Sequence, residues 1–291
     1  MMEGITDRLL HSTVRIDCLD LRGVASSGTG FFYAFISESN MMFPVIVTNK
    51  HVVAGQARGF FQLTYAEDNG EPDFGNHERI ESLGFATEWI EHPDPNVDLA
   101  VYMFGPVVNQ LREIGKSPYF IPITTNLIPD AAQLADLHAV EDIMMIGYPN
   151  GLWDCENNLP IVRRGITATP AFRDYNGKEE FVIDAACFPG SSGSPIFIVN
   201  QGIVSPKNGG TIMGRNRLHF LGVLYAGPQI SATGRIVVKA VPTNVESIPI
   251  VNTMMNLGFC IRASKVQDFE SILRRKGLLP PAMKLLSANA A

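Results

Sequence analysis

The sequence predicts an all-β protein with one helix near its C-terminus. Short runs rich in Val, Ile, Phe and Tyr alternate with Gly, Pro, Asn and Asp along most of the 291 residues, a pattern typical of strands joined by turns. Long segments with apolar residues at helical spacing are almost absent, which favours barrels or a sandwich. An apolar content of 46% with 18% charged residues is that of a folded globular chain.

The expected strands fall into two groups. The first group comprises residues 14–19, 30–36, 45–49, 60–65, 79–85 and 99–104, and the second comprises residues 142–148, 161–167, 181–186, 196–199, 220–225 and 235–241. A proline-bearing stretch from Pro118 to Pro129 separates the groups and is the natural linker. We therefore expect an N-terminal domain over residues 1–125 and a second domain over residues 126–262.

Residues 263–291 are expected to form a helix and a tail. Ser264 and Gln267 fit a capping box, and Gly277 follows the last turn before Pro280 and Pro281. The apolar stripe of this helix consists of Val266, Phe269, Ile272 and Leu273. We expect the stripe to pack on the second group of strands and residues 282–291 to be loosely ordered.

Charge and cysteine content argue against several classes of function. The formal net charge is −6, and we find no Lys/Arg cluster that would serve a nucleic-acid partner. No apolar run is long enough to span a bilayer, and the first residues lack the apolar core of a secretory signal. The four cysteines lie far apart without a C-x-x-C pair. We expect no metal, no cofactor, no membrane partner and a reduced, cytoplasmic protein.

One short loop carries three hydroxyls between two apolar runs. It is Phe188-Pro-Gly-Ser-Ser-Gly-Ser-Pro-Ile-Phe197, which is longer and more rigid than a hairpin turn requires. It is either a tight structural loop or a backbone pocket that holds a nucleophilic serine. A serine nucleophile needs a neutral imidazole to accept its proton and an acid to orient that imidazole.

Two residues have the setting that this chemistry needs. His51 follows the apolar strand Val45-Ile-Val-Thr48 and precedes Gly55, so its side chain can face a cleft. Asp98 lies at the mouth of the buried-looking strand Leu99-Ala-Val-Tyr102, where a carboxylate must find a partner. Asp94 is the second candidate for the acid, and His92 is more readily explained as a surface loop histidine.

These segments resemble the signatures of chymotrypsin-like (trypsin-like) serine peptidases of bacterial type. The three signatures are Thr48-Asn-Lys-His51, Asp98-Leu-Ala100 and Gly190-Ser-Ser192-Gly-Ser-Pro195, in the chain order of that family. Three further segments are similar to strands of the same family: Gly28-Thr-Gly-Phe-Phe32, Ile146-Gly-Tyr-Pro149 and Gly222-Val-Leu-Tyr-Ala-Gly227.

The resemblance implies a fold and a role for each residue. The expected fold is two six-stranded antiparallel β-barrels, the first carrying His51 and Asp98 and the second carrying Ser192, followed by the C-terminal helix. Ser192 would be the nucleophile, His51 the base and Asp98 the residue that orients it. The backbone N–H groups of Gly190 and Ser192 would form the oxyanion hole.

The resemblance also implies a substrate pocket, with departures from the digestive enzymes. Ser191 replaces the Asp that pairs with a new N-terminus in zymogen-type members, and Val52 replaces a bridging Cys. Ala186 occupies the pocket base, so we expect a small or apolar side chain before the cut. Tyr225, Ala226 and Gly227 would bind the substrate backbone.

Two functions are weighed against each other. The first is a serine endopeptidase acting on a protein or peptide substrate, with a possible regulatory partner protein. The alternative is a catalytically silent, peptide-binding pseudopeptidase with the same barrels. An α/β-hydrolase is rejected, because Ser194 stands where its Gly-x-Ser-x-Gly motif needs glycine and its acid and histidine must follow the serine.

Overall fold

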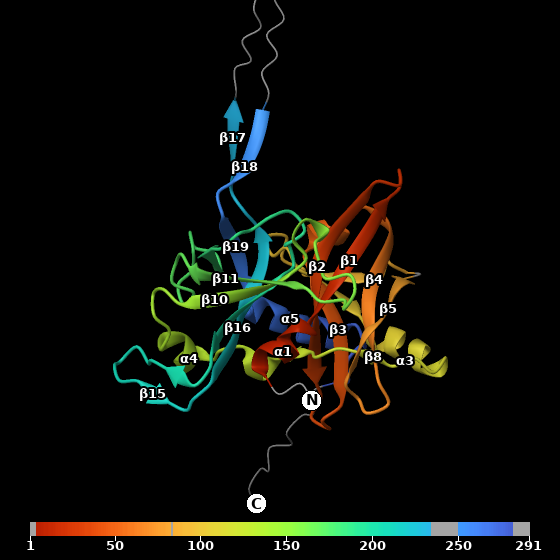
Figure 1. Ribbon diagram of the computed structural model, residues 1–291, viewed down its shortest axis with the longest axis horizontal. Helices are drawn as coiled ribbons and strands as arrows, with labels where there is room; N and C mark the ends of the chain where they lie inside the picture. The colour runs from red at the N-terminus through yellow and green to blue at the C-terminus, as the bar shows by residue number, and fades with distance from the viewer. Residues whose placement is uncertain (1–3, 83, 234–249, 282–291) are drawn as a thin grey trace, which may run out of the picture.

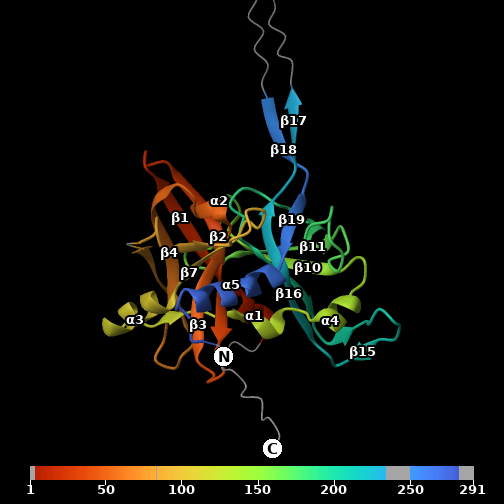
Figure 2. The same ribbon diagram turned by 180° about the vertical axis from the view of Figure 1, so that it is seen from behind.

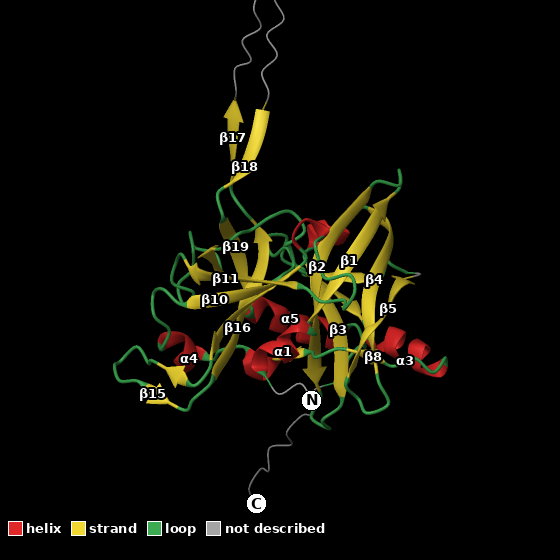
Figure 3. Ribbon diagram, viewed as in Figure 1, coloured by secondary structure: helices red, strands yellow, loops and turns green. Residues whose placement is uncertain are grey.

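The computed structural model describes residues 4–82, 84–233 and 250–281. A large sheet and a barrel lie side by side, and a helix passes behind both (Figure 1). Strands dominate both halves, and the helices are short except for two (Figure 3). The prediction of an all-β fold with a C-terminal helix is confirmed.

The N-terminal half is a nine-stranded sheet. Its main path runs β5-β4-β1-β2-β3-β7-β6, while β8 pairs with β4 and β9 pairs with β2. The strands are β1 (Thr13–Asp20), β2 (Ala25–Ile36), β3 (Met42–Thr48), β4 (Gln56–Ala66), β5 (Pro72–Ser82), β6 (Trp89–Glu91), β7 (Ala100–Met103), β8 (Pro118–Tyr119) and β9 (Ile123–Thr124).

This sheet differs from the closed first barrel that was expected. Its end strands β5 and β6 form no ladder with each other in the described residues. β6 has only three residues, and most of β5 is exposed or half-buried, as suits an edge strand. The sheet curls over an apolar core that includes Ile16, Ile46 and Phe61.

The C-terminal half contains the expected closed barrel of six strands. Its order is β10-β11-β12-β19-β16-β13. The strands are β10 (Asp142–Gly147), β11 (Ile161–Thr167), β12 (Glu180–Asp184), β13 (Pro195–Asn200), β16 (Arg217–Ala226) and β19 (Leu257–Arg262). The closing strand β19 was not anticipated, and the strand expected over residues 235–241 lies outside the described residues.

Two hairpins extend from the barrel. β14 (Ile203–Val204) pairs with β15 (Ile212–Met213), and β17 (Gln229–Thr233) pairs with β18 (Ile250–Met254). The β17–β18 hairpin continues from β16 and projects away from the body of the molecule (Figures 1 and 2).

The described residues also contain five α-helices and two 3-10 turns. They are α1 (Ile5–Leu10), α2 (Lys50–Val53), α3 (Gly105–Glu113), η1 (Thr125–Leu127), α4 (Ala131–Ala135), η2 (Pro149–Gly151) and α5 (Ser264–Arg275). None of these helices has both the length and the apolar character needed to cross a bilayer.

Helix α5 joins the two halves. Its stripe of Val266, Phe269, Ile272 and Leu273 is buried in a core cluster that also includes Phe31 from β2 and Phe220 from β16. The predicted capping box is wrong, because the helix begins at Ser264 and its N-cap is Ala263, without a side-chain cap. Gly277 ends the helix as predicted, with a φ of +72°.

Candidate active site

His51 lies immediately beyond strand β3, on the four-residue helix α2. The strand buries Val45, Ile46 and Val47, so the chain leaves the core abruptly at Asn49 and exposes the next side chains. The Asn49 amide Nδ2 donates a hydrogen bond to the backbone oxygen of Asp98 at 2.7 Å. The start of α2 is therefore tied to the segment that carries the candidate acid.

The side chains of His51 and Asp98 are in direct contact. His51 Nδ1 lies 2.5 Å from Asp98 Oδ2, and the backbone N–H of His51 donates to Asp98 Oδ1 at 3.1 Å. A carboxylate can only accept, so Nδ1 carries the proton of a neutral ring and Nε2 is left as an acceptor. The imidazole is 49% exposed, so its Nε2 side is accessible to a second group.

The loop around Ser192 forms a tight backbone nest. Gly190 and Gly193 have φ values of +83° and +89°, in the region that favours glycine. The N–H of Ser191 donates to the oxygen of Phe188, and that of Ser194 donates to the oxygen of Ser191, both at 3.0 Å. In the described part of the chain, the N–H groups of Gly190 and Ser192 have no acceptor, which suits an anion-binding site.

Thr29 joins this nest to the His51 segment. Its N–H donates to the oxygen of Ser192 at 3.0 Å, and its Oγ1 donates to the oxygen of Gly190 at 2.9 Å. Its own oxygen accepts a 2.7 Å bond from Oγ1 of Thr48, three residues before His51. Ser192 and His51 are thus anchored to the same short stretch of β2, at the seam between the sheet and the barrel.

A family comparison agrees with this arrangement. The model of the trypsin-like peptidase domain matches residues 28–204, which is more than half of the 291 residues. The chain belongs to the trypsin-like peptidase family. The resemblance of its three signature segments to that family is thereby confirmed.

Solved structures of proteases also match the chain. "HtrA-type protease AlgW with tripeptide" is 16% identical with a TM-score of 0.48, and the match covers 94% of this chain and 63% of that one. The Rv3671c protease from M. tuberculosis in its active form is 19% identical with a TM-score of 0.45, covering 94% and 84%. The serine endoprotease from Yersinia pestis is 18% identical with a TM-score of 0.45, covering 93% and 65%.

This trypsin-like peptidase chain spans less than two thirds of the AlgW and Yersinia pestis chains. A comparison with curated protein sequences found no match.

The hydroxyls of the serine loop differ in their surroundings. Ser192 is half-buried, and its Oγ forms no hydrogen bond with His51 Nε2 or with any other described residue. Ser191 and Ser194 are buried, and their Oγ atoms also lack partners. Ser192 is therefore the hydroxyl of the three that remains accessible in this peptidase fold.

The predicted substrate-pocket residues lie at the end of the barrel near this loop. Tyr225 and Ala226 end strand β16, Gly227 follows them, and all three are half-buried, as is Ala186. The Tyr225 hydroxyl donates to Glu180 Oε2 at 3.0 Å. Burial and the neighbouring Glu180 raise the pKa of Tyr225, which keeps the phenol protonated as a donor.

Two residues near the expected pocket were not anticipated from the sequence. Nη1 of Arg163 donates to the oxygen of Ala186, and its guanidinium lies 4.9 Å from the ring centre of Phe188. A Cβ at Gly258 would lie 2.6 Å from Leu224 and 2.7 Å from the Cys187 sulfur. An isolated Gly within a strand pattern is the signal that points to such a close approach.

His92 is not the surface histidine that was expected. It is only 6% exposed, and its Nε2 lies 3.2 Å from Asp268 Oδ2 on helix α5. Its Nδ1 accepts the N–H of Asp94 at 3.2 Å, and its ring packs edge-on against Phe269. The loop that leads to Asp98 is therefore held against α5.

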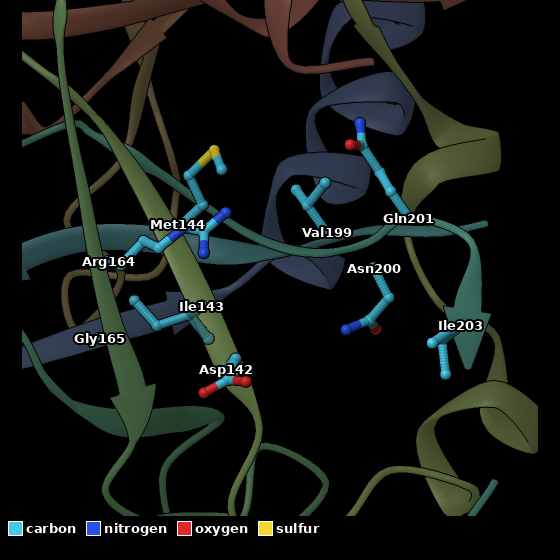
Figure 4. Close-up of a pocket in the computed structure, with 9 residues that line it drawn as sticks. All are labelled: Asp142, Ile143, Met144, Arg164, Gly165, Val199, Asn200, Gln201 and Ile203. Atoms are coloured by element: carbon cyan, nitrogen blue, oxygen red, sulfur yellow. The ribbon is translucent and has the colours of Figure 1, made fainter. Parts of the chain in front are cut away.

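Of two cavities in the described structure, one lies beside the candidate site and the other is lined by none of its residues. One of about 500 Å³ lies between the 94–97 loop, the 174–180 hairpin and Lys265, next to the segment carrying Asp98. Another of about 300 Å³ opens among β10, β11 and the end of β13, lined by polar side chains such as Asp142, Arg164 and Asn200 (Figure 4). None of the predicted site residues lines this second cavity. In the described residues, no group of three or more His, Cys, Asp or Glu side chains is arranged to hold a metal ion.

Proposed function

We propose that this protein is a serine endopeptidase that cleaves peptide bonds through an acyl-enzyme. The carrying observation is the 2.5 Å contact of His51 Nδ1 with Asp98 Oδ2. The Ser192 loop and Thr48, three residues before His51, are both hydrogen-bonded to Thr29 on strand β2. Membership of the trypsin-like peptidase family supports this chemistry.

The first half of the reaction forms the acyl-enzyme. Ser192 Oγ attacks the carbonyl carbon of the peptide while His51 Nε2 takes the hydroxyl proton. Asp98 keeps the proton of His51 on Nδ1 and stabilises the imidazolium that forms. His51 then gives the proton to the leaving amine, the C–N bond breaks, and the acyl group stays on Ser192.

The second half releases the acyl group. A water molecule attacks the ester carbonyl while His51 Nε2 accepts one of its protons, and the proton then passes to Ser192 Oγ as the ester bond breaks. In both halves the N–H groups of Gly190 and Ser192 would bind the negative oxygen of the tetrahedral intermediate. Each such donor is worth about 100- to 1,000-fold in rate in serine peptidases.

A small or apolar side chain before the cut is the preference that the pocket residues support. Ala186 brings no charge, and the apolar side chains of Leu224 and Cys187 lie against Gly258. The guanidinium of Arg163 bonds the backbone oxygen of Ala186. The positive charge of Arg163 beside Ala186 would repel a Lys or Arg side chain of the substrate that entered this pocket.

Peptide-library cleavage, with the products read by mass spectrometry, tests this proposal. Wild-type protein should yield fragments cut after small or apolar residues, and Ser192→Ala and His51→Ala should yield none. Ser194→Ala, which alters a hydroxyl two residues away, should still cut. Cleavage by Ser192→Ala at the wild-type rate would overturn the assignment of the nucleophile, and robust cleavage after Lys or Arg would overturn the assignment of the pocket.

Absence of cleavage by folded wild-type protein would support the pseudopeptidase instead. In that case Ser192→Ala and wild type should bind the same peptides with equal affinity.

A regulatory partner and a cytoplasmic location remain part of the proposal. The four thiols Cys18, Cys155, Cys187 and Cys260 are free in the structure, which is compatible with a reducing compartment.

A further inference from the structure

We propose that Arg15 is a positioning residue that fixes the Gly190 N–H of the oxyanion hole through the turn at residues 148–151. This inference rests on the proposed function. It answers a question raised by Ser191, which stands where zymogen-type members carry the Asp that pairs with a new N-terminus. The Ser191 hydroxyl is buried without a partner, so its side chain forms no bond that would hold the loop.

The loop is held from its carbonyl side. In a trans peptide the C=O and the following N–H point in opposite directions within one plane. Pro189 O therefore belongs to the same rigid unit as the N–H of Gly190, and Ser191 O to the same unit as that of Ser192. A bond that holds the carbonyl oxygen of either unit also fixes the direction of its N–H.

Both carbonyl oxygens are occupied. Ser191 O accepts the N–H of Ser194 at 3.0 Å, a bond made within the loop itself. Pro189 O accepts the N–H of Asn150 at 2.6 Å, a bond that comes from a different part of the chain. Rotation of the Pro189–Gly190 peptide, which would turn the Gly190 N–H away, must break this second bond. The direction of the Gly190 donor thus depends on where Asn150 lies.

The turn that carries Asn150 packs directly on Gly190. Asn150 has the left-handed values φ 50° and ψ 26°, which Asn tolerates better than most residues. A Cβ at Gly190 would lie 2.7 Å from the oxygen of Tyr148 and 3.1 Å from the nitrogen of Asn150. A small displacement of the turn would therefore move the bonded peptide.

Arg15 ties this turn to the N-terminal sheet. Its Nη1 donates to the oxygen of Gly151 at 2.9 Å, and its guanidinium lies 5.1 Å from the ring centre of Trp153. Its Nε donates to Asp17 Oδ1 at 2.9 Å on the same strand, and the side chain is only 19% exposed. A planar guanidinium bonded on two sides and stacked on a ring is well suited to hold a backbone carbonyl in place.

The test compares Arg15→Met, which keeps a long apolar stem on Trp153, with wild type. We expect kcat to fall about 10- to 100-fold, less than the loss of a whole donor, while KM stays within about twofold. The affinity of a peptide aldehyde, whose adduct carries the oxyanion, should fall in parallel with kcat. The pH profile should keep its shape, because His51 and Asp98 are untouched. Arg58→Met is the matched control, because Arg58 is also an arginine of the N-terminal sheet in an ion pair, here with Glu81. This control variant should leave kcat unchanged.

A second pair of variants guards against simple misfolding. Asn150→Gly permits the left-handed turn and should keep at least half of wild-type kcat, whereas Asn150→Val disfavours it and should behave like Arg15→Met. Hydrogen exchange of the Asn150 amide gives a readout that does not need activity. It should be protected in wild type and lose protection in Arg15→Met.

The outcomes separate this inference from the proposed function. Unchanged kcat in Arg15→Met, or a loss confined to KM, overturns the role of Arg15 while leaving the peptidase assignment intact. Equal exchange of the Asn150 amide in wild type and Arg15→Met also overturns it, whether or not the protein cleaves peptides. Cleavage that survives Ser192→Ala overturns the proposed function instead.

Discussion

Asp98 contacts His51 through both of its carboxylate oxygens, one on the ring Nδ1 at 2.5 Å and the other on the backbone N–H at 3.1 Å. The acid therefore fixes both the ring and the backbone that carries it. The sequence left Asp94 open as a second candidate for this role, and the structure places Asp94 elsewhere, with its carboxylate bonded to Asn96.

Asp98→Asn should lower kcat/KM by about 1,000- to 10,000-fold, because an amide does not hold the proton of His51 on Nδ1 or stabilise the imidazolium. Steady-state kinetics on a fluorogenic peptide checks this. Asp94→Asn is the control and should change kcat/KM by less than about twofold, since surface polar changes rarely matter. Comparable losses in the two variants would contradict the assignment of Asp98.

His92→Ala should destabilise the fold by about 2–3 kcal/mol, because it removes a buried ring and leaves the N–H of Asp94 without its acceptor. Urea unfolding with linear extrapolation measures the change in the free energy of unfolding. Asp268→Ala should cost less than about 1 kcal/mol, since the Asp268 carboxylate is 48% exposed. An equal cost for both would show that the contact with Asp268, and not the packing of the imidazole, carries the stabilisation.

His11 should make the fold sensitive to mild acid. Burial lowers the pKa of His11 from 6.5 to about 4. Below pH 6.5 the imidazole of His11 is therefore protonated in the unfolded chain but still neutral in the folded chain. The free energy of unfolding falls as the pH drops from about 6.5 towards 4. The loss between pH 7 and pH 5 is about 2 kcal/mol.

The variant His11→Phe isolates this effect from the titration of the carboxylates. Phe keeps an aromatic ring beside Tyr119 and Phe74 but cannot titrate. Unfolding curves at pH 7 and pH 5 should show a difference about 2 kcal/mol smaller in the variant than in wild type. An identical pH dependence in both proteins would show that His11 does not contribute.

Gly193→Ala should damage both the fold and the site. A Cβ there would lie 1.9 Å from the oxygen of Thr29 and 2.7 Å from Oγ1 of Thr48, so the serine loop would have to leave β2. Gly209 has a similar φ of +94° with nothing within 4 Å of a Cβ, so Gly209→Ala carries only the backbone strain of about 1–2 kcal/mol. Thermal melting should show a clearly larger drop in Tm for Gly193→Ala than for Gly209→Ala. Equal drops would contradict the close packing of Gly193 against Thr29 and Thr48.

Much of this fold was predictable because its strands obey local rules. The strands around His51 and Ser192 are short apolar runs bounded by turn residues. Gly277 follows the last residue of the apolar stripe of α5, and the helix ends there. His51 and Asp98 were found because each interrupts an apolar run at a strand end. The structure brings these two side chains into contact, and their roles in catalysis remain proposals.

The features that were missed depend on long-range packing. Strand β19 closes the barrel through pairs such as Phe181 with Cys260, residues far apart in sequence. The burial of His92 arises from helix α5, more than 170 residues later. Nothing in the sequence near Arg15 indicates its bond to Gly151, which exists because two distant segments meet. The open edge of the N-terminal sheet likewise reflects the short β6, which no composition signal marked.

The central claim is that the hydroxyl of Ser192 is activated by His51 beside an oxyanion nest. The most direct measurement is reaction with a fluorophosphonate, followed by intact-mass analysis and mapping of the modified peptide. The account predicts one adduct per chain, located on Ser192, that is lost in Ser192→Ala and strongly slowed in His51→Ala. A folded wild-type protein that takes up no adduct, or one modified on a different residue, would contradict it.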